Sequence, residues 1–228
     1  AVKLQVALDR VDIPRAEAII DQVAGEADII EIGTSLTKEY GLRALAPVCE
    51  RLAARPAGET GRKAVLLGDI KTCDEGKYEF DLGFDCGFAY LTVMGSSSLG
   101  TLEVCAASAA DHGGEMMIDL LECDESRIEL ISGFPDAVYC LHTSVDSGAT
   151  ADPVGQVRAF KARFPQITRI GIAGGIKPDQ LAGLAAEGVE IAIMGSAITK
   201  AGDIAAACRA CADRKSTRLN SSHNAQSR

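Results

Sequence analysis

The chain has 228 residues, enough for one domain, and 47% of them are hydrophobic, so a well-buried core is expected. Its formal net charge of −9 counts against a nucleic acid or an anionic membrane as partner, because the long-range field repels polyanions. A small anionic substrate remains compatible, since Lys side chains, backbone N–H groups or a metal ion can make one site locally positive.

Short apolar, β-branched runs alternate with helical stretches along the chain. Segments such as 14–23 and 99–112 are amphipathic, and Pro178 is expected in the first turn of the helix after the seventh strand. Most of the runs are apolar at nearly every position, as in parallel strands covered by helices. The runs that we predict as strands are residues 2–9, 27–33, 63–71, 88–95, 115–121, 137–143, 169–175 and 191–197.

Eight βα units in about 210 residues favour the α/β class and a closed (β/α)8 TIM barrel, near the lower end of its size range. The alternative is an open, doubly wound sheet. Such a sheet often carries a glycine-rich fingerprint after its first strand, where this chain has Leu8-Asp9-Arg10. The polar stretch 54–62 is predicted as a loop at the bottom of the barrel.

We expect a single barrel over residues 1–214 and a disordered tail over 215–228. The tail is polar and aperiodic, and it resembles read-through of vector sequence; a natural disordered tail is the alternative. In either case His223 is not expected in a site.

The eight cysteines are scattered through predicted strands and helices, which is typical of reduced thiols. Cys208 and Cys211 are expected to be packing thiols in the last helix. The first residues do not resemble a signal peptide, and no apolar run approaches the ~18–20 residues of a membrane span, so a cytoplasmic location is expected.

Polar residues collect at the predicted C-terminal ends of the strands, where catalytic groups lie in such barrels. Burying a charged side chain without a partner on an apolar strand costs several kcal/mol of folding free energy, so each of these charged residues needs a partner. Asp69 and Lys71 are two apart on a strand, so both can point into the barrel mouth, and Glu31 comes from the adjacent strand. Two convergent acids can hold Mg²⁺, which prefers oxygen ligands. The set comprises Asp9, Glu31, Asp69, Lys71, Asp74, Asp119, His142 and Asp146.

The alternative for Asp9, Glu31, Asp69 and Lys71 is a structural ion-pair network, although their common position on one rim favours a function. His142 is either a hydrogen-bonded core residue or a general acid/base; its place across the rim from Lys71 favours the second. The roles of Asp119 and Asp146 stay open.

Glycines follow the last two predicted strands, at Gly174-Gly175 and at Gly195-Ser196. The loops after strands seven and eight of such barrels frequently bind phosphate through backbone N–H groups. Glycine lets the backbone approach an oxyanion closely. These four residues are therefore the predicted phosphate site.

The segment Asp69-Ile-Lys71-Thr-Cys-Asp74 resembles the D-x-K-x-x-D signature of the orotidine-5′-phosphate decarboxylase suprafamily. Further segments resemble its branch of 3-hexulose-6-phosphate synthases and 3-keto-L-gulonate-6-phosphate decarboxylases. Together they span nearly the whole barrel. The segments are LQVALD (4–9), DIIEIGT (28–34), LTVMGS (91–96), IAGGIK (172–177) and MGSAIT (194–199).

Within this branch the chain is more similar to the synthases. Decarboxylases resemble H-R-S-R-D after strand six and synthases H-[TA]-G-x-D, whereas residues 142–146 read HTSVD, with neither arginine. Ser196 stands where the decarboxylases carry an arginine. The chain also departs from the synthases, with Gly148 in place of a common Gln and Ser35 in place of the usual Pro.

The resemblance implies a Mg²⁺-dependent carbon–carbon lyase that joins formaldehyde to D-ribulose 5-phosphate through an enediolate. It implies that Glu31 and Asp69 hold Mg²⁺ and that His142 removes a C1 proton. Lys71 would stabilise the enediolate oxygen, and Asp9 would orient Lys71. It also implies a homodimer with shared active sites, in which Asp74 reaches into the partner subunit's site.

Three alternatives remain. The 3-keto-L-gulonate-6-phosphate decarboxylase uses the same intermediate with loss of CO₂. A non-catalytic sugar-phosphate-binding barrel is the alternative from another class, and the intact set of Asp69, Lys71 and Asp74 counts against it. Orotidine-5′-phosphate decarboxylase itself is disfavoured, because that branch needs a second lysine and aspartate arrangement and lacks the EIGT strand.

Overall fold

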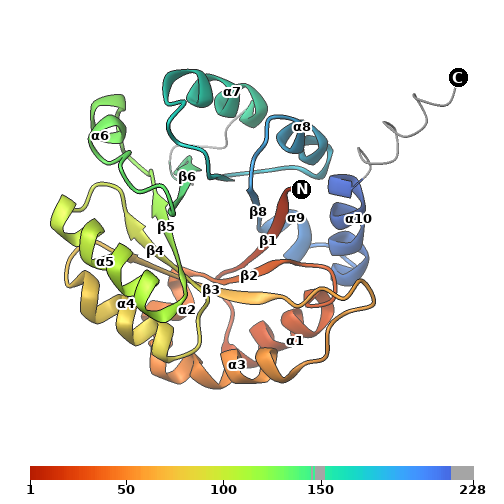
Figure 1. Cartoon of the computed structure of the whole chain (residues 1–228). Coiled ribbons are helices and arrows are strands. Elements are labelled where there is room, and N and C mark those ends of the chain that lie inside the picture. Colours follow the sequence, from red (N-terminus) through yellow and green to blue (C-terminus); the bar gives the residue numbers. More distant parts are fainter. Residues whose placement is uncertain (145, 147–151, 217–228) are drawn as a thin grey trace, which may run out of the picture.

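A computed structural model of the chain describes residues 1–144, 146 and 152–216. Within these residues, eight parallel strands close into a barrel in chain order, with β8 paired to β1 (Figure 1). The predicted (β/α)8 barrel is confirmed, and each expected strand is present with shorter bounds. The strands are β1 Lys3–Leu8, β2 Ile29–Ile32, β3 Val65–Thr72, β4 Tyr90–Met94, β5 Glu115–Asp119, β6 Val138–His142, β7 Ile170–Ala173 and β8 Ile191–Met194.

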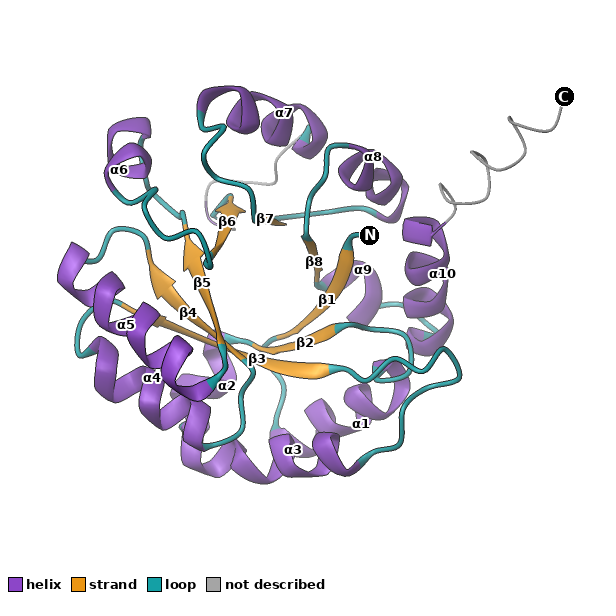
Figure 2. Ribbon diagram, in the orientation of Figure 1, coloured by secondary structure: helices purple, strands orange, loops and turns teal. Residues whose placement is uncertain are grey.

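The helices surround the barrel on its outside (Figure 2). The α1 and α5 helices form where the amphipathic pattern predicts them, and the carboxylate of Asp12 caps α1 by accepting from the Arg15 N–H. Two helices follow β2 rather than one, because Gly41 breaks the segment with φ of +83°. The helices are α1 Ile13–Val23, α2 Thr34–Tyr40, α3 Leu42–Ala54, α4 Gly76–Asp85, α5 Leu99–His112, α6 Glu125–Leu130, α7 Pro153–Arg163, η2 Pro178–Gln180, α8 Leu181–Ala186, α9 Ser196–Thr199 and α10 Ile204–Ser216.

Alternate residues of each strand face the barrel interior. Apolar interior residues such as Leu67, Met117 and Cys140 form one cluster, separate from the larger core that includes the outward residues and the helices. Two positions further along the same strands, this inward register carries Asp69, Asp119 and His142. The polar groups therefore lie above a packed apolar floor, at the C-terminal ends of the strands.

The last helix extends past the expected domain boundary. The α10 helix ends at Ser216, and the buried Lys215 forms an ion pair with Asp28. Two residues assigned to the tail therefore belong to the barrel, because this ion pair anchors the end of α10 next to the start of β2. Residues 217–228, with His223, lie outside the described residues, as do Val145 and Gly148.

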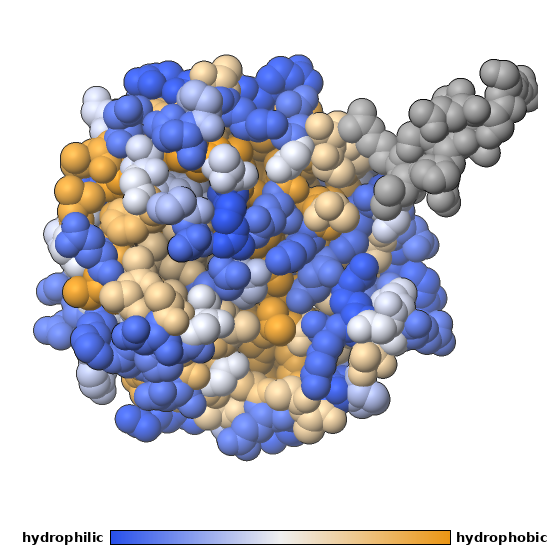
Figure 3. Space-filling view, viewed as in Figure 1, coloured by the Kyte–Doolittle hydropathy of each residue, from blue (hydrophilic) through white to orange (hydrophobic). Residues whose placement is uncertain are grey.

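The polar character of the surface and the state of the cysteines agree with what the composition predicts. Hydrophilic side chains cover much of the face shown in Figure 3, with hydrophobic areas between them. In the described part of the chain, no helix is long and apolar enough to span a membrane. All eight cysteines are unbonded, and Cys208 and Cys211 are buried on α10 as expected for packing thiols.

Candidate functional site

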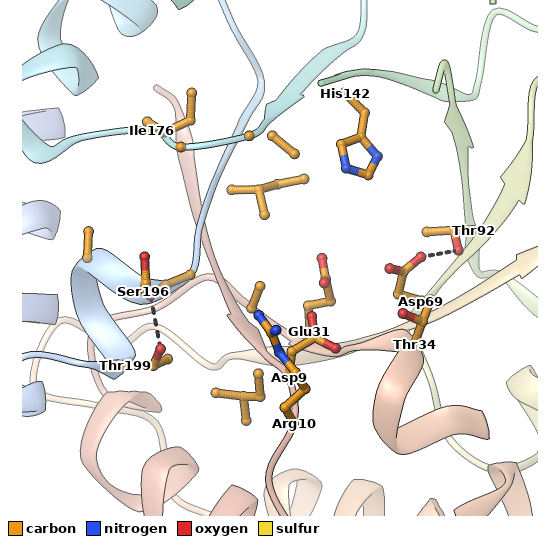
Figure 4. Close-up of a pocket in the computed structure, with 18 of the residues that line it drawn as sticks. Asp9, Arg10, Glu31, Thr34, Asp69, Thr92, His142, Ile176, Ser196 and Thr199 are labelled. Atoms are coloured by element: carbon orange, nitrogen blue, oxygen red, sulfur yellow. Dashed lines mark hydrogen bonds between the residues drawn. The ribbon is translucent and has the colours of Figure 1, made fainter. Parts of the chain in front are cut away.

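A pocket of about 760 Å³ opens at the C-terminal ends of the strands. Figure 4 shows Glu31, Asp69 and His142 entering it from different strands. Of the residues predicted from sequence, Asp74 and Asp146 are exposed and do not line this pocket. The pocket brings together the predicted residues Asp9, Glu31, Asp69, Lys71, Asp119, His142, Gly174, Gly175, Gly195 and Ser196.

The Lys71 ammonium lies between two carboxylates. Its Nζ is 2.8 Å from Asp119 Oδ2 and 3.4 Å from Asp69 Oδ2. Burial lowers the pKa of Lys71, but the charges of Asp69 and Asp119 outweigh it and raise that pKa overall. Lys71 therefore carries a fixed positive charge in the pocket.

The end of β3 is distorted where it delivers Lys71. The pairing of β3 with β4 shifts register between Gly68 and Thr72, and Lys71 has φ of +46°, a left-handed conformation that is costly for a residue with a side chain. Thr92 on β4 holds this turn: its Oγ1 accepts from the Lys71 N–H at 3.0 Å and donates to Asp69 Oδ1 at 2.8 Å. One hydroxyl thus holds both the Asp69 carboxylate and the backbone of Lys71.

Asp119 joins Lys71 to His142. The Nδ1 atom of His142 is 3.1 Å from both Asp119 oxygens, so the Nδ1–H is donated to the carboxylate and Nε2 carries the lone pair. Burial raises the pKa of Asp119, but the hydrogen bond from His142 and the charge of Lys71 outweigh it and lower that pKa to about 2. Asp119 stays ionised and fixes the imidazole tautomer.

Glu31 is a buried acid that forms no ion pair with any of the described residues. Its Oε1 accepts a 2.6 Å hydrogen bond from Gln5 Nε2, while Gln5 Oε1 has no hydrogen-bond partner. Burial and the charge of Asp69 raise the pKa of Glu31 to about 8, and burial also raises the pKa of Asp69, against the opposing charge of Lys71. Two desolvated carboxylates that repel each other are a donor set that a divalent cation would stabilise.

Asp9 differs from its expected role. Lys71 contacts Asp69 and Asp119, whereas Asp9 Oδ1 accepts from the Ser35 hydroxyl at 2.9 Å. Among the described residues, the expected orientation of Lys71 by Asp9 is therefore not supported by a direct ion pair. The left-handed turn at Lys71 brings its ammonium to β5 instead. The Asp9 carboxylate lies against Gly33, where a Cβ would be 2.2 Å from Oδ1, so a side chain at this position would displace the carboxylate.

The loops after β7 and β8 bring backbone to the same pocket. Gly174 and Gly175 have φ of +107° and +66°, and a Cβ on Gly174 would lie 3.2 Å from the Thr143 carbonyl oxygen. At Gly195 no atom of the described residues, its chain neighbours aside, lies within 4 Å of the Cβ position, so this position faces open space. This geometry is compatible with an anion at the predicted phosphate site.

The sequence pattern assigns no role to several residues that line the pocket or lie beneath it. The pattern marks Asp119 as a carboxylate at a strand end but does not predict its contacts with Lys71 and His142, and it predicts no role for Gln5 or Thr92. The signal was available, since both are polar residues in the inward register of otherwise apolar strands. Three further residues line the pocket, Arg10, Arg15 and Lys200. They lie in loops and on a helix, where the hydrophobic pattern does not predict that a side chain points into the barrel mouth.

Comparison with known proteins agrees with the motifs. A family model described as "Orotidine 5'-phosphate decarboxylase / HUMPS family" matches residues 2–211. The chain is 30% identical over 205 residues to a 3-hexulose-6-phosphate synthase of Methylomonas aminofaciens, covering 89% of this chain and 94% of that protein. It is also 30% identical over 213 residues to the protein of the same name from Mycobacterium gastri, covering 91% and 97%.

Solved structures of both enzyme types share this fold. A 3-hexulose-6-phosphate synthase from Salmonella typhimurium matches with a TM-score of 0.81 and 28% identity, covering 95% of this chain and 99% of that one. A 3-keto-L-gulonate-6-phosphate decarboxylase from Vibrio cholerae matches with a TM-score of 0.75 and 25% identity, covering 93% and 98%. The resemblance to this branch, first seen in short motifs, is confirmed over nearly the whole barrel.

Proposed function

The chain belongs to the orotidine 5′-phosphate decarboxylase / HUMPS family, and within it we propose an aldolase of the 3-hexulose-6-phosphate synthase type. This carbon–carbon lyase would condense formaldehyde with D-ribulose 5-phosphate. The observation that carries the proposal is a permanent cation, Lys71, held 2.8 Å from the carboxylate that also orients His142. A fixed positive charge beside an oriented base suits proton abstraction next to a carbonyl.

His142 is the base in this proposal. Because Asp119 binds Nδ1, Nε2 is free to take a proton from C1 of the sugar phosphate, and the resulting enediolate carries negative charge on oxygen. The Lys71 ammonium stabilises that oxygen. The enediolate carbon then forms a bond to the formaldehyde carbon, and the formaldehyde oxygen takes up a proton, which the imidazolium can return.

Glu31 and Asp69 fit a magnesium ion. Among the described residues no group of three or more His, Cys, Asp or Glu side chains could hold a metal. Mg²⁺, however, commonly takes one or two carboxylates and completes its shell with water and substrate oxygens. When bound, Mg²⁺ would act as a Lewis acid on the substrate oxygens. The mutual repulsion of the two acids supports the assignment.

Asp74 supports a homodimer with shared sites. It is exposed outside the pocket, although it belongs to the motif that supplies Asp69 and Lys71. The neighbouring helices α4 and α5 present exposed Tyr78, Leu99 and Val104 on the surface. A second copy of the chain packed there would cover this apolar surface and bring Asp74 to its own pocket.

The first prediction is a direct assay. Purified protein with Mg²⁺, D-ribulose 5-phosphate and formaldehyde is expected to consume formaldehyde, and EDTA is expected to stop the reaction until Mg²⁺ is restored in excess. The measurement is the loss of formaldehyde together with the appearance of a hexulose phosphate.

The rival functions give different results in that assay. Unchanged formaldehyde with CO₂ release from 3-keto-L-gulonate 6-phosphate would establish the decarboxylase. Binding of D-ribulose 5-phosphate without turnover of either substrate would establish a non-catalytic barrel. Either result contradicts the proposal.

The second prediction concerns metal binding and stability. The pKa of Glu31 is raised from 4.5 to about 8, so the folded protein holds a proton that the unfolded chain releases, and this contribution to folding weakens as pH rises from 4.5 to about 8. Mg²⁺ would replace that proton. We therefore expect Mg²⁺ to raise the melting temperature more at about pH 8 than at about pH 6.

Calorimetry at both pH values, with Mg²⁺ or with EDTA, measures this effect independently of activity. Glu31→Gln is the matched variant, because it keeps the shape and cannot ionise. It is expected to lose both the Mg²⁺ effect and its pH dependence. An equal Mg²⁺ effect in Glu31→Gln would remove Glu31 from the metal site.

A further inference from the structure

Three cations line the pocket without an acidic partner. Arg10 follows β1, Arg15 lies on α1 and Lys200 follows α9. Among the described residues, none of the three side chains forms an ion pair, although acidic residues outnumber basic ones in this chain, 32 to 23. Elsewhere on the surface, Arg51, Arg158 and others do pair with glutamates.

The backbone of Arg10 is fixed in a tight turn at the end of β1. It has φ of +56°, a left-handed conformation that turns the chain at the end of β1. Its N–H donates to Ser35 Oγ at 2.6 Å, and the same hydroxyl donates to Asp9 Oδ1 at 2.9 Å. Figure 4 shows the Arg10 side chain drawn into the pocket between Ser196 and Glu31. Ser35 therefore fixes the turn from which this guanidinium projects.

The three cations share the pocket with the glycine loops. Gly195 and Ser196 line the same pocket as Arg10 and Lys200, and α9 contacts β1. Ser196 supplies no charge of its own. A phosphate at the backbone of Gly195 would therefore meet positive side chains that follow β1 and β8, two strands paired in the barrel. A guanidinium can make two charge-assisted hydrogen bonds to the phosphate oxygens.

We propose that Arg10, fixed by Ser35 and assisted by Arg15 and Lys200, binds the phosphate group of the sugar-phosphate substrate and sets the preference of this enzyme for phosphorylated sugars. The inference rests on the proposed function for the identity of the substrate. The anion site itself does not depend on that reaction. Two departures from the family motifs then have one explanation. Ser196 replaces the arginine of the decarboxylases, and Ser35, which replaces the usual Pro of the synthases, positions Arg10 after β1 to supply the positive charge.

Binding of inorganic phosphate tests the site without turnover. Isothermal titration at constant ionic strength is expected to give an affinity roughly tenfold weaker for Arg10→Gln than for the unaltered chain, with smaller losses for Arg15→Gln and Lys200→Gln. Arg10→Lys keeps the charge and is expected to lose less. Arg43→Gln is the matched control, since it removes an exposed arginine of α3 that does not line the pocket, and it is expected to keep full affinity.

Ser35 is a positioning residue in this scheme, and a double-mutant cycle tests it. Ser35→Ala is expected to weaken phosphate binding when Arg10 is present and to add nothing in the Arg10→Gln background. In kinetics, Arg10→Gln is expected to raise KM for D-ribulose 5-phosphate more than it lowers kcat.

The outcomes separate this proposal from the proposed function. Phosphate binding that depends on Arg10, without formaldehyde consumption, supports the anion site and overturns the synthase. Formaldehyde consumption with an unchanged KM and phosphate affinity in Arg10→Gln overturns the anion site and leaves the synthase standing. No phosphate binding by the unaltered chain also overturns the anion site.

Discussion

Replacing Lys71 with alanine is expected to lower kcat/KM by about 10³-fold or more, because it removes the fixed charge that faces the developing enediolate oxygen. Nothing else that is described in the pocket replaces it: Arg10, Arg15 and Lys200 follow β1 and β8, whereas Lys71 lies between Asp69 and Asp119. The measurement is steady-state formaldehyde consumption with saturating Mg²⁺.

The barrel is expected to fold without Lys71. Asp119 keeps its hydrogen bonds from His142 and from the Leu121 N–H, and Asp69 keeps the one from Thr92. Circular dichroism and the melting temperature check this. Lys71→Arg, which retains charge in a different shape, is expected to recover part of the loss. Activity close to that of the unaltered chain in Lys71→Ala would remove Lys71 from the mechanism.

The same variant tests the shared site. If Asp74 acts in the partner's pocket, Lys71→Ala and Asp74→Ala are each inactive alone, but subunits mixed after mild dissociation form heterodimers with one intact site. Random mixing of two such variants gives about a quarter of full activity. Recovery to that level supports the homodimer. No recovery, or a chain that sediments as a monomer, contradicts it.

The period of the apolar runs was sufficient to predict the barrel. Eight runs, most of them apolar at nearly every position, are consistent with a parallel sheet covered by helices. The inward register of these strands then predicts Glu31, Asp69 and His142 at one rim. Register also carried the signal for Thr92 and Gln5, because both interrupt apolar strands on the inward side.

The contacts between the side chains of the site could not be predicted from the sequence. The strand pattern predicts that Lys71 points inward, but not that a left-handed turn carries its ammonium to Asp119 on β5. The expected pair of Asp9 and Lys71 failed for this reason. Arg10 and Ser35 depend on the path of a loop, which periodicity does not describe. The end of α10 was missed because Lys215 looks like a tail residue until its buried partner, Asp28, is known.

Asp119→Asn is expected to lower kcat by about 10²–10⁴-fold, because it changes two partners at once. An asparagine can present its amide N–H to His142 Nδ1, which would move the imidazole proton to Nε2 and leave no base facing C1. It also removes the carboxylate 2.8 Å from Lys71, so the ammonium keeps only Asp69 at 3.4 Å. The measurements are kcat over a range of pH and the imidazole tautomer by nitrogen NMR.

The surface supplies a matched control for this variant. His112 Nε2 lies 3.3 Å from Asp85 Oδ1, an aspartate–histidine contact outside the pocket, so Asp85→Asn removes a similar pair and is expected to leave kcat unchanged. Since the pKa of Asp119 is about 2, its ionisation does not change near neutral pH, and the loss in Asp119→Asn should not recover as pH is raised. Full activity at high pH would mean that Asp119 tunes only the basicity of His142. A normal tautomer together with a low kcat would instead assign the loss to Lys71, and so place the fixed ammonium, rather than the base, at the centre of the chemistry.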